Sequence, residues 1–254
     1  MRCCKGHEFY VLSYNLVFIC LAIFTVAVLY SSVGHAGASG YIATLTLFGL
    51  SPASIKPTAL ILNILVACIG TYQFWRAGHF SWELFWPFAI LSVPFAFLGG
   101  YLIVPAHVLR VIVGGVLLCS ALRLFFSRKD PENVHTPHLT AAIPVGAGIG
   151  FLSGITGTGG GIFLTPMLLF FRWSYVKTAA AVSALFILLN SLSGFLGYAI
   201  SRQPIPAITW PLAITVIFGG TLGSYLGSRH LTSRLIRMAL AVVLTIAGFK
   251  LIFT

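Results

Sequence analysis

Ser153-Gly-Ile-Thr-Gly-Thr-Gly-Gly-Gly161 and Ser31-Ser-Val-Gly-His-Ala-Gly-Ala-Ser-Gly40 are two glycine-rich segments, each of which interrupts an otherwise apolar stretch of the chain. In hydrocarbon every backbone N–H and C=O group needs a partner, so a broken helix at membrane depth is tolerated only where protein buries it or where it lines a cavity. Paired, glycine-interrupted hydrophobic segments in the two halves of a membrane protein indicate where its binding site lies. We call residues 31–40 the first break and residues 153–161 the second break.

Composition places the chain among polytopic membrane proteins. Of its 254 residues 58% are hydrophobic and only 7% are charged, whereas a soluble domain has roughly 25% charged residues. Lys and Arg number 15 against four Asp and Glu, which gives a net charge of +11. A basic membrane interior without carboxylates suits an anion, although Lys and Arg also gather in the cytoplasmic loops of any such protein. The four carboxylates all fall at predicted helix ends or in loops: Glu8, Glu83, Asp130 and Glu132.

Several classes of site are absent from the sequence. The five cysteines show neither a Cys-x-x-Cys motif nor a Cys/His spacing typical of metal ligands. The second break is not a nucleotide loop, because no GxxxxGK[ST] motif occurs and no strand precedes the glycines. We therefore expect no metal, no cofactor and no nucleic-acid partner.

The apolar runs predict eight long membrane helices and two short segments. A run of roughly 20 residues is long enough to cross a bilayer, and we interpret the first run as such a helix rather than as a signal peptide. Two shorter apolar pieces, 41–50 and 162–171, follow the two breaks and are too short to cross at ~1.5 Å per residue, so they are predicted to be half-helices or re-entrant segments. The long runs are 11–32, 57–75, 84–104, 108–126, 139–155, 177–200, 207–227 and 234–253.

The two halves of the chain align with each other. Ser32 pairs with Ser153, Gly40 with Gly161, Thr44 with Thr165 and Lys56 with Lys177 at one constant spacing, and Asn63 pairs with Asn190 after a small gap. The prediction is an all-α polytopic membrane protein built from two tandem repeats. Whether the repeats are inverted or parallel stays open, because it depends on whether the short segments count as crossings. The predicted units are a tail (1–10), a first repeat (11–126), a polar linker (127–138) and a second repeat (139–254).

Backbone amides and hydroxyl groups of the breaks form the candidate binding site. Glycines leave backbone amides unshielded, and a short helix that follows a break aims its first N–H groups into it, which makes a ready anion site. The alternative is that the glycines only permit close helix packing. The candidate residues are Ser32, Gly37, Ser39 and Gly40 in the first break, and Ser153, Thr156, Gly157, Thr158, Gly159, Gly160 and Gly161 in the second.

Five further side chains are candidates for the same site. His35 is the titratable side chain within the breaks, so it could carry a proton or contact an anion. Lys56 and Lys177 begin the long helices after the short segments, where they could attract anions or simply snorkel to the headgroups. Asn63 and Asn190 lie inside apolar spans and must bond to another helix, to water or to substrate, because an unsatisfied amide there is costly.

At these residues the chain resembles the TauE/SafE-type family of sulfite exporters, also called the TSUP permeases, whose repeats carry a Gly-x-Gly-Gly-Gly-like segment followed by a Pro and a distal Asn. The match is Gly157-Thr-Gly-Gly-Gly-Ile-Phe-Leu-Thr-Pro166 with Asn190, and a degenerate version is Gly34-His-Ala-Gly-Ala-Ser-Gly40 with Asn63. The resemblance covers residues 15–254. It implies a multi-pass permease of a prokaryotic cytoplasmic membrane that transports small sulfur-containing anions, such as sulfite, sulfoacetate or related organosulfonates.

Two other classes of function fit the sequence less well than transport. A membrane accessory or assembly subunit with a small-anion site is the alternative, but hydrophilic docking surface is scant beyond residues 127–138. An intramembrane enzyme lacks support, since no carboxylate dyad, His/Glu metal pair or Ser–His spacing occurs within the spans. The expected partners are a small anionic substrate and the lipid bilayer, and a homo-oligomer is compatible with the sequence.

Overall fold

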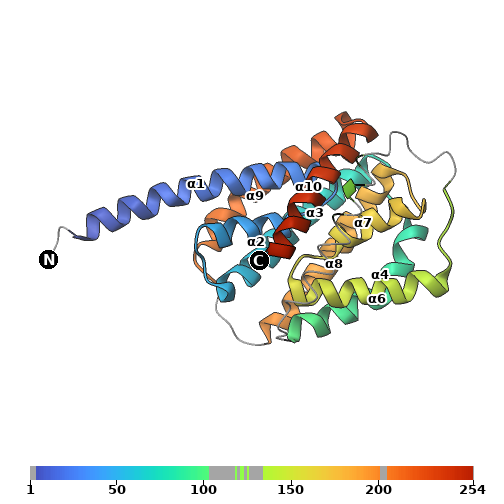
Figure 1. The fold of residues 1–254 in the computed structure, drawn as a ribbon, viewed down its shortest axis with the longest axis horizontal. Helices are drawn as coiled ribbons and strands as arrows, with labels where there is room; N and C mark the ends of the chain where they lie inside the picture. Colours follow the sequence, from blue (N-terminus) through green and yellow to red (C-terminus); the bar gives the residue numbers. More distant parts are fainter. Residues whose placement is uncertain are drawn as a thin grey trace.

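The computed structural model describes residues 4–102, 134–200 and 205–253, together with positions 118, 121, 122 and 125. Over these residues the chain is a bundle of helices without strands (Figure 1). The predicted run 108–126, apart from those isolated positions, and the linker up to residue 133 lie outside the described residues. The long helices are α1 (Cys4–Ser32), α3 (Pro52–Arg76), α4 (Trp82–Tyr101), α6 (Leu139–Thr156), α8 (Val176–Ala199), α9 (Thr209–Tyr225) and α10 (Ser233–Phe253), and the short ones are α2 (Ala38–Leu47), α7 (Gly161–Phe170) and the π-helical turn η1 (Leu226–His230).

Among the described residues, five helices are long and apolar enough to cross a membrane: Ser54–Arg76, Trp82–Tyr101, Leu139–Thr156, Val176–Ala199 and Thr209–His230. Their outer faces carry large exposed apolar side chains, such as Trp210 and Phe218 on α9. A helix that is apolar on its outer face as well as its inner one belongs in lipid. The chain is therefore a multi-pass membrane protein, as its composition predicted.

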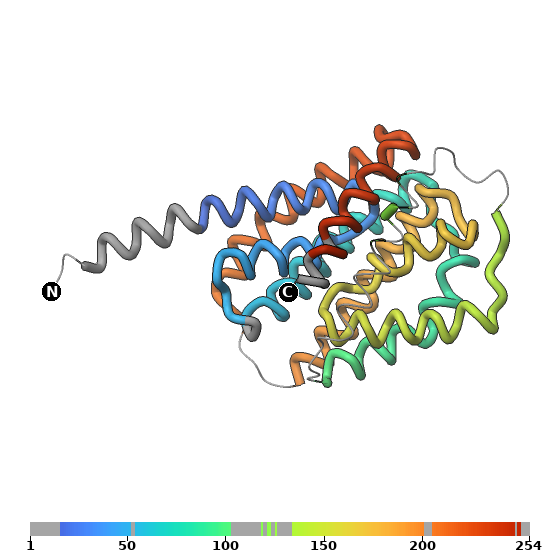
Figure 2. Tube along the Cα trace, viewed as in Figure 1, coloured from blue at the N-terminus to red at the C-terminus, as the bar shows by residue number. Residues whose placement is uncertain are grey.

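The short helices α2 and α7 each have the length of a segment that cannot cross alone, as predicted (Figure 2). α2 begins at Ala38, inside the first break, which is earlier than the predicted start at residue 41. α3 begins at Pro52 instead of residue 57, because proline is well tolerated in the first turn of a helix. α2 packs against α3, and α7 packs against α8.

The most extensive helix pairings join the first part of the chain to the second. α4 packs along α6, and α1 packs along α9. Glycines make both pairings close: a Cβ on Gly154 of α6 would overlap the carbonyl oxygen of Ala96, and one on Gly223 of α9 would overlap that of Val28. Such small-residue contacts are a common basis of helix association in membranes.

α3 and α8 cross between these two pairings. α3 also contacts α9, α8 also contacts α4, and the two helices contact each other extensively. Both are well buried for membrane helices, with 67% of the most apolar stretch of α8 buried inside the structure. The surfaces on which α3 and α8 contact each other therefore lie at the centre of the bundle, close to both breaks.

Candidate functional site

The first break connects α1 to α2 through two glycines in the left-handed region. Gly34 has φ 77° and Gly37, the N-cap of α2, has φ 94°, a conformation that side chains other than glycine rarely adopt. A Cβ on Gly34 would overlap the backbone of Ala180 in α8. All residues from Ser31 to Gly40 are buried. The first break is therefore seated against a helix of the second half.

The second break has the same construction. Gly157 ends α6 with φ 72°, and Gly160, the N-cap of α7, has φ 80°. Between them, Gly159 has φ 77°, and a Cβ there would lie 2.5 Å from Asn63 Nδ2. The second break is therefore seated against α3, a helix of the first half. Neither α2 nor α7 has a side-chain cap at its N-terminus.

Asn63 of α3 joins the two breaks. Its Oδ1 accepts a hydrogen bond from the backbone N–H of Ala38 at 3.1 Å, at the start of α2. Its Nδ2 donates to the carbonyl oxygen of Thr158 at 3.4 Å and to Ser191 Oγ of α8 at 2.9 Å. The His35 ring also lies close to the backbone of Gly161. The structure thus brings together the two breaks, which are far apart in the sequence.

Three buried polar atoms around the breaks have no hydrogen-bond partner among the described residues: His35 Nε2, Tyr41 OH and Ser153 Oγ. A Cβ on Gly37 would lie 2.9 Å from Tyr41 OH, and a Cβ on Gly160 would lie 3.3 Å from Ser153 Cβ. Each unpartnered hydroxyl group therefore lies beside the N-cap glycine of a short helix. Buried polar atoms are nearly always hydrogen-bonded in folded proteins, so these three atoms are candidates for contact with a bound water molecule or ligand.

The His35 side chain is 3% exposed, and its Nδ1 lies 3.2 Å from the carbonyl oxygen of Val33. That contact holds the ring by Nδ1, while Nε2 has no hydrogen-bond partner among the described residues. Tyr41 is a residue that the sequence reasoning missed. Its position directly after Gly40, at the end of the first break, was the available signal.

Other predicted hydroxyl groups lie at the breaks but bond within the protein. Ser32 Oγ donates to the carbonyl oxygen of Leu29 at 2.7 Å. Thr156 Oγ1 donates to that of Leu152 at 2.7 Å and lies 2.8 Å from Thr158 Oγ1. Ser39 Oγ donates to Tyr30 OH at 3.0 Å. Hydroxyl groups bonded to the carbonyl one turn back have already committed their proton.

The internal alignment pairs Asn63 with Asn190 and Lys56 with Lys177, but the two members of each pair lie in different surroundings. Asn190 Oδ1 accepts from Ser92 Oγ of α4 at 2.8 Å, and its Nδ2 donates to the carbonyl oxygen of Phe186 at 2.9 Å. Asn190 therefore links α8 to α4. Lys56 Nζ donates to the carbonyl oxygen of Gly100 at 3.5 Å and lies 5.9 Å from the ring centre of Tyr198.

The stem of Lys56 also lies beside the second break, because a Cβ on Gly157 would be 3.5 Å from Lys56 Cγ. Lys177 is half-buried at the second residue of α8. The structure therefore places Lys56 beside the second break, which is where a residue that attracts anions to the breaks would need to lie.

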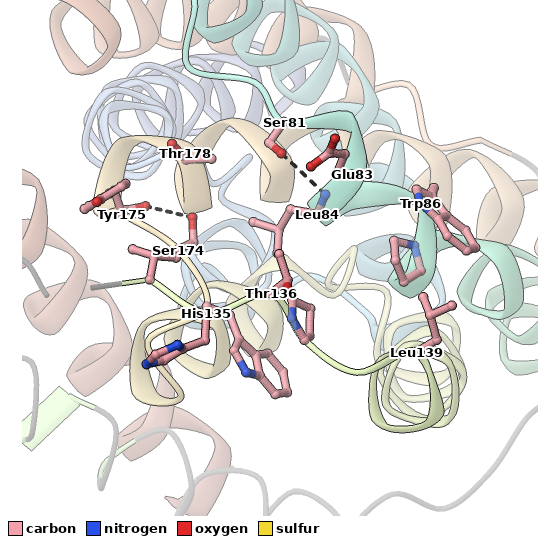
Figure 3. A pocket seen from close by; sticks show the side chains of 14 residues that line it. Ser81, Glu83, Leu84, Trp86, His135, Thr136, Leu139, Ser174, Tyr175 and Thr178 are labelled. Carbon is pink, nitrogen blue, oxygen red and sulfur yellow. Dashed lines mark hydrogen bonds between the residues drawn. The ribbon is translucent and has the colours of Figure 1, made fainter. Parts of the chain in front are cut away.

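A separate pocket of about 310 Å³ opens where α4 begins, between the segment that leads into α6 and the turn from α7 to α8. Figure 3 shows Ser81 and Glu83, at the start of α4, facing His135 and Thr136, which lie in the segment that leads into α6. The Ser81 and Ser174 side chains bond to nearby backbone atoms within their own segments. The carboxylate of Glu83 makes this pocket less suited to an anion than the breaks are.

Comparison with known proteins is consistent with this architecture. The family described as Sulfite exporter TauE/SafE matches residues 19–251. The probable membrane transporter protein y4hK of Sinorhizobium fredii is 43% identical over 241 residues, which cover 92% of this chain and 97% of that protein. A probable membrane transporter protein of Methanocaldococcus jannaschii is 26% identical over 205 residues, covering 75% of this chain and 76% of that protein. No solved structure matches the chain. With nearly its whole length matched, the chain belongs to the TauE/SafE sulfite exporter family of membrane transporters.

Proposed function

We propose that this protein is a secondary permease or exporter of the inner membrane that moves small sulfur-containing anions, such as sulfite or short organosulfonates, and that the two breaks form its substrate site. The observation that carries the proposal is the set of unpartnered buried atoms beside the breaks: His35 Nε2, Tyr41 OH and Ser153 Oγ. The hydroxyl groups of Tyr41 and Ser153 can donate hydrogen bonds to oxygen atoms of the anion. Because Nδ1 of His35 already donates to the carbonyl oxygen of Val33, Nε2 can donate to the anion when the ring is protonated. An oxyanion would satisfy both hydroxyl groups and the protonated form of His35.

The backbone supports the same choice of ligand. α2 and α7 both begin after an N-cap glycine, which has no side chain to bond the first N–H groups of the helix, although one of these groups in α2, on Ala38, bonds to Asn63 Oδ1. The first N–H groups of a helix have no partner within it, and the helix dipole places a partial positive charge there. We propose that the backbone N–H groups from Thr158 to Gly161 and those in the first turn of α2 after Ala38 bind the anion, since the N–H groups of Gly157 and Ala38 already bond to Ser153 and Asn63. The hydroxyl groups of Ser32 and Thr156 support the backbone by bonding to carbonyl oxygens, and those of Ser39 and Thr158 bond to the hydroxyl groups of Tyr30 and Thr156. Asn63 holds the two breaks together, Asn190 holds the surrounding helices, and Lys56 and Lys177 attract anions towards the site.

The pattern of helix contacts supports the division into two tandem repeats, 11–126 and 139–254. In such a duplication α1 corresponds to α6 and α4 corresponds to α9, so the pairing of α4 with α6 is equivalent to the pairing of α9 with α1. Both pairings are present and both are extensive. A transporter built from two repeats can move its substrate by rocking one bundle against the other around a fixed central site. In this proposal the protein transports its substrate unchanged and catalyses no reaction.

Reconstitution of the purified protein into proteoliposomes tests the proposal. We expect saturable flux of sulfite or of a short organosulfonate, above the flux of protein-free vesicles of the same lipid composition. Thermal-shift measurements with sulfite, thiosulfate, sulfate and short sulfonates identify which anion stabilises the protein, since a ligand that binds only the folded state raises the melting temperature. Flux of all these anions at the level of empty vesicles would overturn the proposal.

A further inference from the structure

The His35 ring lies where the two breaks meet. It belongs to the first break, and it also lies close to the backbone of Gly161 at the end of the second. Its Nδ1 lies 3.2 Å from the carbonyl oxygen of Val33, and because a carbonyl oxygen can only accept, Nδ1 carries a proton. Its Nε2 is buried and has no hydrogen-bond partner among the described residues. Nε2 therefore presents a lone pair when the ring is neutral and an N–H group when the ring is protonated.

The protein alone satisfies neither form of the ring. The lone pair of a neutral ring needs a donor, whereas a protonated ring needs an acceptor and a counter-ion, because a buried charge is costly without a partner. The helices that flank or contact the breaks, α1, α2, α3, α7, α8 and α10, carry no carboxylate among their described side chains. A protonated His35 would therefore lack a counter-ion until an anion binds.

His35 is also the group around the breaks whose charge ordinarily changes near neutral pH. No other histidine occurs on these helices among the described side chains. Their titratable side chains that are at least partly buried are tyrosines, lysines, one cysteine and one arginine: Cys20 and Tyr30 of α1, Tyr41 of α2, Lys56 of α3, Lys177 and Tyr198 of α8, and Arg237 of α10. A proton that is bound together with the anion near neutral pH is therefore held by His35 or by the anion itself.

We propose that each anion binds together with one proton, which lies between His35 Nε2 and an oxygen atom of the anion. This inference rests on the proposed function. The anion supplies the negative charge that a buried imidazolium needs, and the proton supplies a positive charge that the other, neutral groups of the breaks do not. Since the two bind together, each raises the affinity for the other by the same factor.

The bound proton narrows the substrate class to anions of weak oxyacids. Hydrogen sulfite carries its own acidic proton, so it can donate to the lone pair of Nε2 while its other oxygen atoms accept from the hydroxyl groups of Tyr41 and Ser153. A sulfonate carries no such proton, so the ring must first take one from the solvent. Both complexes then contain one ring, one proton and one anion. The sulfonate complex is the weaker of the two, because its proton must be drawn from bulk water.

The test measures anion binding and proton uptake by the purified wild type, His35→Gln and His79→Gln, with sulfite and methanesulfonate as the probes. His79 is the matched control, because its Nε2 already has a partner in the carbonyl oxygen of Ser228 at 3.1 Å. At about pH 6 we expect the wild type to bind sulfite about tenfold or more tightly than methanesulfonate, and to take up about one proton per methanesulfonate from a weakly buffered solution. H79Q should stay within about twofold of the wild type in both affinities.

For H35Q we expect no proton uptake with methanesulfonate, and affinities for the two anions within about twofold of each other, because an amide can donate or accept without changing its charge. Wild-type preference for sulfite retained in H35Q would overturn the inference. If H35Q does not fold, judged by size-exclusion profile in detergent, the wild type decides at about pH 8.5 with sulfite dianion as the probe: uptake of about one proton per bound sulfite supports the inference and no uptake overturns it.

The outcomes separate this inference from the proposed function. If the wild type neither binds nor transports any sulfur anion, the proposed function fails and the inference fails with it. If the wild type transports sulfite but binds methanesulfonate equally tightly and without proton uptake, the inference fails while the proposed function stands.

Discussion

Asn63 donates a hydrogen bond to the carbonyl oxygen of Thr158, although 95 residues separate the two in the sequence. The same side chain accepts a hydrogen bond from the first N–H group of α2. One amide on α3 therefore holds both breaks in place. The equivalent residue of the second half, Asn190, bonds instead to α4 and to its own helix.

This difference predicts unequal effects of the same substitution at the two asparagines. Both Asn63→Ala and Asn190→Ala remove a buried amide and leave its partners unsatisfied, so each is expected to lower the free energy of unfolding by about 1–3 kcal/mol. Only Asn63→Ala should also lower the rate of anion flux strongly, because only Asn63 bonds to the breaks. Flux in proteoliposomes together with thermal unfolding of both variants checks this. Equal loss of flux from the two variants at equal stability would contradict the bridging role of Asn63.

Gly159 and Gly49 form a matched pair for testing the second break. Both have φ 77°, but a Cβ on Gly49 would meet no atom within 4 Å, whereas one on Gly159 would lie 2.5 Å from Asn63 Nδ2 and 2.7 Å from Ser191 Oγ. Alanine in the left-handed conformation costs about 1–2 kcal/mol at either position. We expect Gly159→Ala to abolish flux and Gly49→Ala to keep most of it, measured at equal amounts of inserted protein. Normal flux from Gly159→Ala would argue strongly against the second break as the site.

Ser153 and Ser183 allow a ligand-binding role to be separated from a structural one. Ser153 Oγ has no partner among the described residues, whereas Ser183 Oγ accepts a hydrogen bond from Thr165 Oγ1 at 2.6 Å. Ser183→Ala should therefore destabilise the protein by about 1–3 kcal/mol, since it leaves the Thr165 hydroxyl group unsatisfied. Ser153→Ala should leave the melting temperature without anion unchanged and raise the KM for the transported anion. A lowered melting temperature with an unchanged KM for Ser153→Ala would refute this assignment.

The close pairing of α4 and α6 can be tested on a single helix. A Cβ on Gly154 would overlap the backbone of Ala96, whereas one on Gly148 of the same helix would meet no atom within 4 Å. Gly148→Ala is expected to be neutral or stabilising by up to about 1 kcal/mol, because alanine has the higher helix propensity. Gly154→Ala should lower the melting temperature in detergent, since α4 and α6 must separate to admit the methyl group. Equal melting temperatures for the two variants would contradict this packing.

The local features of the fold could be predicted from the sequence. The breaks were predicted because glycine is the residue that adopts a left-handed backbone most readily, and Gly34, Gly37, Gly157, Gly159 and Gly160 all adopt it. The short helices were predicted from the length of the apolar pieces, although α2 (Ala38–Leu47) both begins and ends a few residues earlier than the predicted segment 41–50. These predictions succeed because glycine conformation and helix length depend on neighbouring residues.

The long-range features could not be predicted in the same way. The internal alignment treats Asn63 and Asn190 as equivalents, but their roles depend on Ser191 and Ser92, which other helices bring to them. Arg237 resembles an ordinary arginine near a helix end, and only the structure shows that it is buried. Tyr41 resembles a core residue, and only the position of its hydroxyl group beside Gly37 sets it apart. In each case the environment is made by parts of the chain that are distant in sequence.

The seating of the two breaks has a mechanical consequence. Gly34 packs against α8 and Gly159 packs against α3, so each half of the molecule supplies the surface against which the break of the other half packs. A movement of one half relative to the other must then change the conformation of both breaks at the same time. A substrate bound between the two breaks would therefore favour or oppose each such movement, which couples the opening of the protein to the binding of its substrate.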